Sequence, residues 1–213
     1  MKNYSLALVL LSCLLSFSCS DDDISNEIPE DAVPEKTTFE FANLEVGNYW
    51  IYDVFLVTEE GEETQTAEAD SVFIVGDTII GDKRLLIHSG YDYLVPGNFM
   101  IFDSANTIFT YPRREVLFTL DESVVVEKDE EEFNGAASAV FGLESTPSTV
   151  SVPAGDFECL NYQGFLTSTD PDTNIVRTSN RFYSEDVGLI LRQDQFLSTG
   201  TSLDARLIRF GSN

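Results

Sequence analysis

The 213-residue chain has very little of the chemistry that enzyme active sites usually employ. His88 is its single histidine, and its three cysteines are Cys13, Cys19 and Cys159. A serine triad needs a histidine that a carboxylate orients toward a nucleophile, and a zinc site needs several histidine or cysteine ligands. The sequence has neither a nucleophile-elbow glycine pattern nor a glycine-rich phosphate loop. The composition therefore predicts a protein that is not an enzyme and that holds no catalytic residue, metal or cofactor.

Positively charged side chains are also scarce. The chain has 12 lysines and arginines against 37 aspartates and glutamates, a formal net charge of −25. Such a charge repels nucleic acid and anionic lipid headgroups, so we expect neither as a direct partner. With so many acids, sequence alone does not single out the carboxylate pair that a glycosidase would need. Most acidic runs are interpreted as solvated surface.

One acidic group resembles the beginning of a calcium loop. Residues 170–174 read Asp-Pro-Asp-Thr-Asn, but Ile175 stands where such a loop has glycine, and Arg181 stands where it has its last carboxylate. We therefore interpret this segment as a hairpin turn.

Long apolar runs are absent except at the beginning of the chain. Residues 4–17 form a 14-residue apolar stretch preceded by Lys2. A membrane-spanning helix needs about 20 residues, so this stretch suits the core of a secretory signal better than a stable span. Residues 1–18 are therefore predicted to be a signal peptide.

The end of this leader resembles a bacterial lipoprotein cleavage site, with a small residue, Ser18, immediately before Cys19. Ser16 stands where the usual pattern has an aliphatic residue. Cys13 fits the local pattern better, but cleavage there would leave a short core and an apolar stub. The acidic run at 21–23 resembles the export tag of surface-exposed lipoproteins in Bacteroidota. The resemblance implies that Cys19 carries lipid, palmitate included, and anchors the protein to the outer membrane, exposed at the cell surface. An ordinary signal peptide is the alternative.

Residues 19–40 are predicted to be a lipidated, flexible tether. The segment is rich in acids, and Pro29 and Pro34 interrupt it. Self-repulsion and proline favour an extended, unfolded chain.

Residues 41–213 are predicted to form one all-β domain. Short apolar runs alternate with turn residues, and no window shows a sustained helical period. This spacing predicts an antiparallel curved sheet closing into a half-barrel, barrel or sandwich, with at most one short helix. The predicted strands cover residues 48–57, 71–80, 83–89, 99–102, 107–111, 116–120, 124–127, 150–152, 157–166, 175–183, 189–196 and 205–210. Residues 136–143 are left open as a short helix or a loop.

Two reactive side chains lie within these predicted strands. His88, near a strand end, is interpreted as a surface or hydrogen-bonded residue, with a catalytic base as the alternative. Cys159 would be the only free thiol once Cys19 is acylated, and we interpret it as a buried, inert thiol.

Three blocks resemble a family of uncharacterised secreted β-proteins common among Bacteroidota lipoproteins. They are VGNYWIY at 46–52, VPAGDFEC at 152–159 and YSEDVGLI at 183–190. The resemblance implies an all-β, curved-sheet domain and no particular reaction. Gly47 and Gly188 suit sharp or close backbone positions, and Trp50 and Tyr52 suit the core.

These observations lead to three functional hypotheses. The first is a non-enzymatic cell-envelope lipoprotein that binds a ligand or scaffolds a complex, with an unidentified envelope protein or glycan as partner. The second is a carrier of a lipid or other apolar molecule inside the curved sheet. The third is a glycan hydrolase, which requires two carboxylates about 5–10 Å apart in a cleft.

Overall fold

The structure, a computed structural model, describes residues 36–66, 69–92, 95–96 and 98–212. The predicted signal peptide, Cys13, Cys19 and most of the predicted tether lie outside the described residues. Among the residues that are described, no helix has the length and apolar character that crossing a membrane requires.

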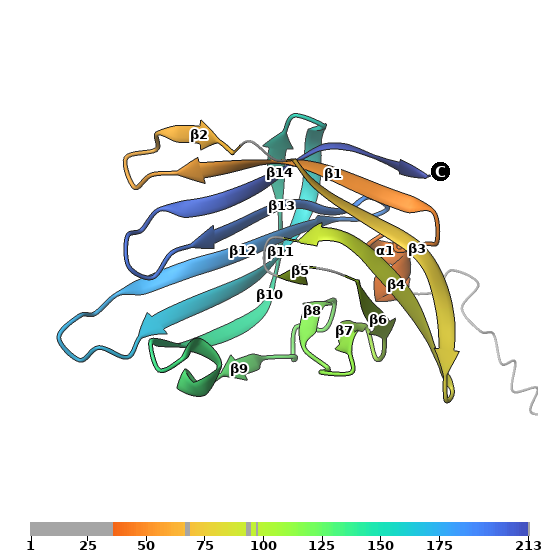
Figure 1. The fold of residues 1–213 in the computed structure, drawn as a ribbon, viewed down its shortest axis with the longest axis horizontal. Coiled ribbons are helices and arrows are strands. Elements are labelled where there is room, and N and C mark those ends of the chain that lie inside the picture. Colours follow the sequence, from red (N-terminus) through yellow and green to blue (C-terminus); the bar gives the residue numbers. More distant parts are fainter. Residues whose placement is uncertain (1–35, 67–68, 93–94, 97, 213) are drawn as a thin grey trace, which may run out of the picture. The chain divides into compact units, whose positions relative to one another are not determined.

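The described part of the chain is almost entirely β-structure (Figure 1), which confirms the predicted fold class. The elements are α1 Thr38–Phe41, β1 Asn48–Val57, β2 Glu63–Gln65, β3 Asp70–Ile80, β4 Lys83–Asp92, β5 Val95–Pro96, β6 Phe99–Asp103, β7 Thr107–Tyr111, β8 Val116–Thr119, β9 Val126–Lys128, the 3₁₀ turn η1 Glu130–Phe133, β10 Ala137–Val152, β11 Gly155–Ser168, β12 Val176–Ser184, β13 Gly188–Gln195 and β14 Ser202–Ser212.

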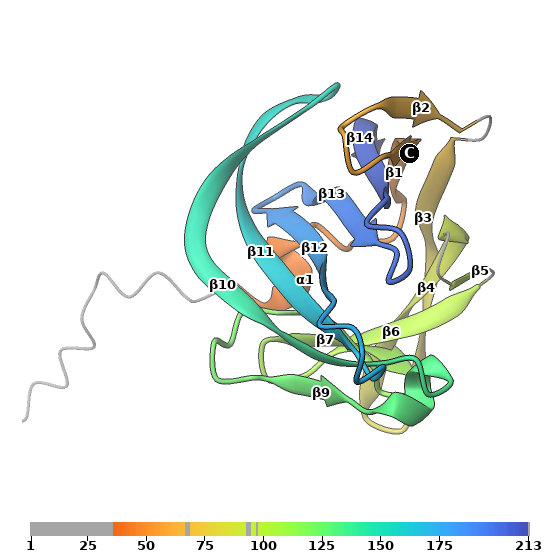
Figure 2. The same ribbon diagram turned by 90° about the vertical axis from the view of Figure 1, so that its left-hand side faces the viewer.

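One antiparallel sheet contains all of these strands. Its order is β8-β7-β6-β4-β3-β1-β14-β13-β12-β11-β10-β9, with β2 paired to β1 and β5 paired to β4. The sheet is therefore a long meander in which the first and last strands pair in the middle. Figure 2 shows it curving round, with β10 and β11 arching along one side and β3 and β4 along the other. The sheet thus nearly closes into a barrel.

The two ends of the sheet do not complete the barrel. Between described residues, no hydrogen-bonded ladder joins β8 to β9. Strand β8 instead lies against β10. We call this unpaired interval between β8 and β9 the seam.

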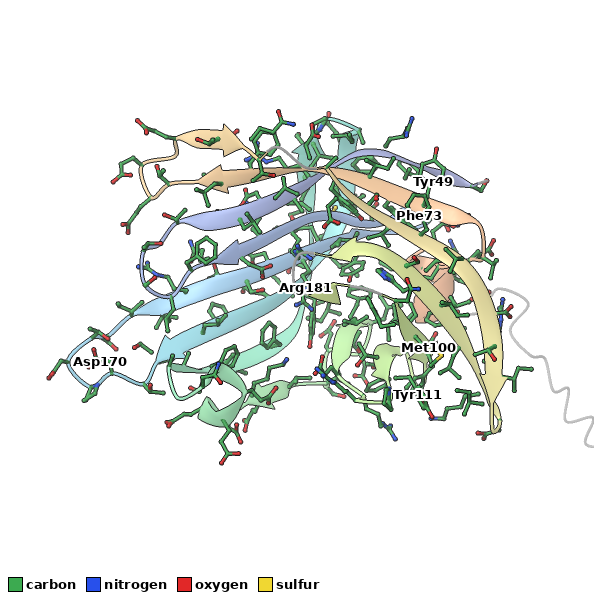
Figure 3. The ribbon with its side chains drawn as sticks, viewed as in Figure 1. Tyr49, Phe73, Met100, Tyr111, Asp170 and Arg181 are labelled. Atoms are coloured by element: carbon green, nitrogen blue, oxygen red, sulfur yellow. The ribbon has the colours of Figure 1, made fainter. Side chains whose placement is uncertain are left out.

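Strand β1 has the predicted bounds, and Trp50 and Tyr52 are in the core as expected. Val54 is buried on the same face. Leu56, two residues farther along that face, is 38% exposed because it lies near the end of the strand, where β2 is the neighbour on one side. On the opposite face, Tyr49 packs against Phe73 of β3 with ring centroids 6.1 Å apart (Figure 3).

The two alternatives left open for residues 136–143, a helix or a loop, are both wrong. Residues 137–143 begin β10, a 16-residue strand that pairs with β11. Ala137, Ala139 and Phe141 are buried at every second position. Alanine and glycine have low strand propensity, so the pattern was obscured, and cross-strand pairing determines the conformation. Farther along, the register of β10 shifts between Glu144 and Ser148, which accommodates a proline within the strand.

The ladder of β3 and β4 shifts register between Ile74 and Gly76. The hairpin turn predicted at residues 170–174 is confirmed. Residues 170–174 form the turn between β11 and β12, and the backbone N–H of Asp172 donates to the Asp170 carboxylate at 3.0 Å. Figure 3 shows Asp170 at the tip of this hairpin. Among the described residues, no cluster of three or more histidine, cysteine or acidic side chains could hold a metal.

Helix α1 overlaps the last three residues of the segment predicted as tether. A capping box begins it: Glu40 N–H donates to the Thr37 hydroxyl at 3.2 Å, and the Thr37 N–H donates to the Glu40 carboxylate at 2.8 Å. The Phe41 ring stacks on Phe118 of β8 with centroids 5.7 Å apart. The Phe118 ring also stacks on Tyr183 of β12, at 4.1 Å. This aromatic stack joins strands from the two halves of the meander.

Candidate functional site: a cavity inside the curved sheet

A cavity of about 300 Å³ lies within the curved sheet. This volume is at the lower end of the range for small-molecule sites. Its lining comes from both halves of the meander: Ala42, Leu44, Trp50, Tyr52, Asp70, Val72, His88, Phe99, Ile101, Ile108, Glu115, Val116, Leu117, Lys128, Arg181, Tyr183, Leu189, Arg192 and Ala205. The curvature of the sheet is what brings these distant residues together.

Two aromatic side chains of β1 form part of the apolar wall. The Trp50 indole N–H donates to the Val187 carbonyl at 2.6 Å, and the Tyr52 hydroxyl donates to the Leu189 carbonyl at 2.9 Å. Strands β13 and β14 pair only from Leu191 onward, so their ladder does not reach these two carbonyls. The two aromatic side chains therefore donate to backbone carbonyls that lie beyond the β13–β14 ladder.

His88 is 9% exposed and lies in the cavity wall, not at the surface. Its ring stacks on Phe99 with centroids 4.2 Å apart, because the two residues are paired across β4 and β6. The described residues that line the cavity include no serine, threonine or cysteine. The described wall therefore lacks the serine, threonine or cysteine that a histidine base would activate in a triad.

Cys159 lies on β11, outside the residues that line the cavity. It is a buried free cysteine, as predicted. Burial raises the pKa of its thiol to about 11. Because the thiolate is the reactive form, this environment keeps the thiol unreactive near neutral pH.

Cations are concentrated in the cavity. Lys128, Arg181 and Arg192 line it, and these are three of only 12 cationic residues in the chain. Asp70 and Glu115 are the acids among its described lining residues, although the chain has 37 acids. The charge balance of the cavity is thus opposite in sign to that of the whole chain.

Most of the charged lining lies toward the seam. Glu115 and Leu117 belong to the β8 segment, Lys128 ends β9, and Arg181 projects from β12 (Figure 3). An Arg181 guanidinium N–H lies 3.5 Å from the Leu117 carbonyl, at the limit of a hydrogen bond. Polar lining residues therefore lie toward the seam and also, as Asp70 of β3 and Arg192 of β13, in the middle of the sheet, while apolar residues form the rest of the wall.

Sequence reasoning did not identify these three cations as site residues. Arg192 stands alone in its predicted strand, but Arg181 shares its strand with Arg177, and Lys128 follows directly after the predicted strand 124–127, so no local signal marks the three as a group. Their convergence depends on strand order, which the local pattern does not contain.

No protein-family model and no curated protein matches the sequence. Three solved structures show partial likeness, each at 12% identity. A Bacteroides fragilis protein, described as exported and with a YmcC-like fold, has a TM-score of 0.46 over 79% of this chain and 97% of that one. A Parabacteroides distasonis protein described as a lipoprotein has a TM-score of 0.43 over 83% and 100%. YmcC of Escherichia coli, described as a hypothetical lipoprotein, has 0.35 over 75% and 84%. At these scores the likenesses say nothing about the function of this chain.

Proposed function

We propose that this chain is a non-enzymatic cell-envelope lipoprotein whose β-domain binds a small, largely apolar molecule inside its curved sheet. The observation that carries the proposal is the cavity of about 300 Å³, with an apolar wall that includes Trp50, Ile101 and Leu189. Concave, mostly apolar cavities with a few polar groups are typical of small-molecule sites. The proposal combines the binding and carrier hypotheses formed from the sequence.

The anchoring part of the proposal rests on the sequence alone. The 14-residue apolar leader, Cys19 and the acids that follow it support a lipid-anchored protein at the outer membrane, exposed at the cell surface. The non-enzymatic part also rests on the sequence, which has neither a nucleophile-elbow glycine pattern nor a glycine-rich phosphate loop.

Trp50 provides a direct test, because it is the only tryptophan of the chain and it lines the cavity. The mature lipoprotein, held in phosphatidylcholine vesicles, is titrated with 1-octanol while its fluorescence is recorded, and protein-free vesicles measure partitioning. We expect a saturable change in Trp50 emission. A response that never saturates would contradict ligand binding in the cavity.

A matched pair of variants locates the binding. Val72 lines the cavity, whereas Val75, on the same strand, is 58% exposed. Val72→Phe should fill part of the cavity and weaken octanol binding at least about fivefold, since pocket volume limits what a site can hold. Val75→Phe should bind octanol as the unsubstituted protein does. Equal binding by all three proteins would place the ligand elsewhere.

A scaffolding role is the second candidate, favoured by one exposed apolar cluster. Val140 of β10 and Phe165 of β11 are directly paired and are 46% and 48% exposed. Exposed apolar clusters often mark interaction sites. A photo-crosslinking residue at position 165 in intact cells should trap one defined envelope protein, whereas the same residue at the 74% exposed Ile79 should not. Identical products from both positions would remove this candidate.

A further inference from the structure

We propose that the ligand of this cavity is an amphipathic anion, an apolar chain ending in a carboxylate or a phosphate, whose charged end is bound by Arg181 and Lys128 at the seam. This inference rests on the proposed function and specifies the ligand class for the same site. It is carried by the placement of charges in the cavity wall.

Arg181 and Arg192 are direct cross-strand partners. The ladder of β12 and β13 pairs them, and both line the cavity, so they lie on the same face of the sheet. Like charges directly opposite one another in a sheet are destabilising. Two facing guanidinium groups therefore need a negatively charged group nearby to offset their repulsion.

Arg192 has a carboxylate partner within the sheet. Its side chain is 6% exposed, and its Nε lies 3.2 Å from an Asp194 carboxylate oxygen. The ion pairs between described residues include none for Arg181. Its guanidinium is instead near the Leu117 carbonyl, at 3.5 Å, and 6.0 Å from the centre of the Phe141 ring. Arg181 thus retains donors for a further acceptor.

Lys128 approaches the same ring from β9. Its Nζ lies 5.8 Å from the Phe141 centroid, so both cations have this ring as a neighbour, and both line the cavity. Lys128 also pairs with Glu132 at 3.6 Å, and the Glu132 side chain is 48% exposed. Exposed pairs of this kind are weak and readily exchanged. Lys128 is therefore able to contribute to the binding of an external anion.

The geometry points to one orientation of the ligand. Arginine presents a rigid fork of donors that matches carboxylate and phosphate oxygens. The apolar wall at Trp50 and Leu189 would take the chain, and the seam would take the charged end. The net negative charge of the protein repels extended anionic surfaces, but a single small anion responds to the local cations.

The test compares three ligands of equal chain length, using the Trp50 assay described above at pH 8. We expect octanoate and octyl phosphate to bind at least about tenfold more tightly than 1-octanol. Their affinity should fall as salt is raised, because screening weakens charge interactions, whereas that of octanol should not. The relative strength of the two anions distinguishes a carboxylate from a phosphate ligand.

Arg181→Gln should lower the affinity for both anions about tenfold and leave the affinity for octanol unchanged. Arg209→Gln is the matched control, because Arg209 is exposed and also lies over an aromatic ring, that of Tyr49, but does not line the cavity. Arg209→Gln should leave the affinity for all three ligands unchanged. Urea unfolding supplies a second readout: removing one of two facing cations should not lower the unfolding midpoint.

The outcomes separate the two proposals. If octanol binds but neither anion is preferred, the proposed function stands and this inference is overturned. Arg181→Gln could instead weaken the binding of octanol as much as that of the anions and also lower the urea midpoint. Arg181 would then be a structural contact, and the inference is again overturned. If no ligand binds, the proposed function itself fails.

Discussion

The Tyr52 hydroxyl donates a 2.9 Å hydrogen bond to the Leu189 carbonyl, two strands away in the sheet. The ladder of β13 with the intervening strand, β14, does not extend to Leu189. A side chain of β1 therefore donates to the backbone of β13 where the β13–β14 ladder is absent, and it does so in the wall of the cavity. The aromatic residues of β1 thus both hold the curved sheet together and line its interior.

Removing the Tyr52 hydroxyl should destabilise the fold. Tyr52→Phe leaves the Leu189 carbonyl without this donor, and the expected loss is about 1 kcal/mol in the free energy of unfolding. Urea unfolding followed by circular dichroism measures it. Tyr49→Phe, on the opposite face of the same strand, is the control and should change the midpoint much less. Equal effects of the two substitutions would contradict the role assigned to the bond.

Substitution of Gly188 should be costly because Ala42, the residue that caps the end of helix α1, packs directly against this glycine. Its φ is +100°, and a Cβ added there would lie 2.6 Å from the Ala42 carbonyl oxygen. We expect Gly188→Ala to lower the free energy of unfolding by about 1–3 kcal/mol, through backbone strain and overpacking. Thermal and urea unfolding both report this.

Gly142 provides the comparison for that substitution. A Cβ at Gly142 meets nothing within 4 Å. Gly142→Ala, within β10, should therefore be neutral or stabilise the protein by about 0.5 kcal/mol, because alanine has less backbone freedom to lose. A loss as large as that of Gly188→Ala would show that close approach is not what matters at Gly188.

Cys159 should make stability depend on alkaline pH. Burial raises the pKa of its thiol from 9.0 to about 11. A group whose pKa is raised in the folded state contributes stability that is complete below the unfolded pKa and is lost as pH rises through the folded pKa. Between pH 9 and about 11 the protein should therefore lose more stability than its Cys159→Ala variant does. Urea unfolding at pH 8 and pH 10, with a reductant present, measures how far the free energy of unfolding of each protein falls between the two pH values.

The same burial predicts slow chemistry at the thiol. Cys159 is 1% exposed, so a thiol reagent at pH 8 should modify it slowly in the native protein and rapidly in urea. Rapid modification of the folded protein at pH 8 would contradict the inert assignment.

Lipid attachment at Cys19 is tested in cells. Cys19→Ala should abolish incorporation of radiolabelled palmitate and release the protein from the membrane fraction, because the leader is too short for a stable span. Cys13→Ala serves as control and should leave labelling unchanged. Continued labelling of Cys19→Ala would place the lipid elsewhere.

The bounds of β1 could be predicted because ten residues in succession alternate on two largely apolar faces. The start of β10 could not, because small residues give weak strand preference, and its pairing with β11 decides the conformation. The residues of the cavity were harder to predict than the strands.

His88 is buried because β4 lies between β3 and β6 and places it in the cavity wall. Arg181 and Arg192 face each other through the register of β12 and β13. Such relationships arise between strands, and a pattern within one strand does not specify them.

The two edge strands at the seam are consecutive in the chain, since only residues 120–125 separate β8 from β9. The barrel therefore fails to close between two strands that are neighbours in the sequence, so the gap interrupts one local connection and does not separate distant parts of the chain.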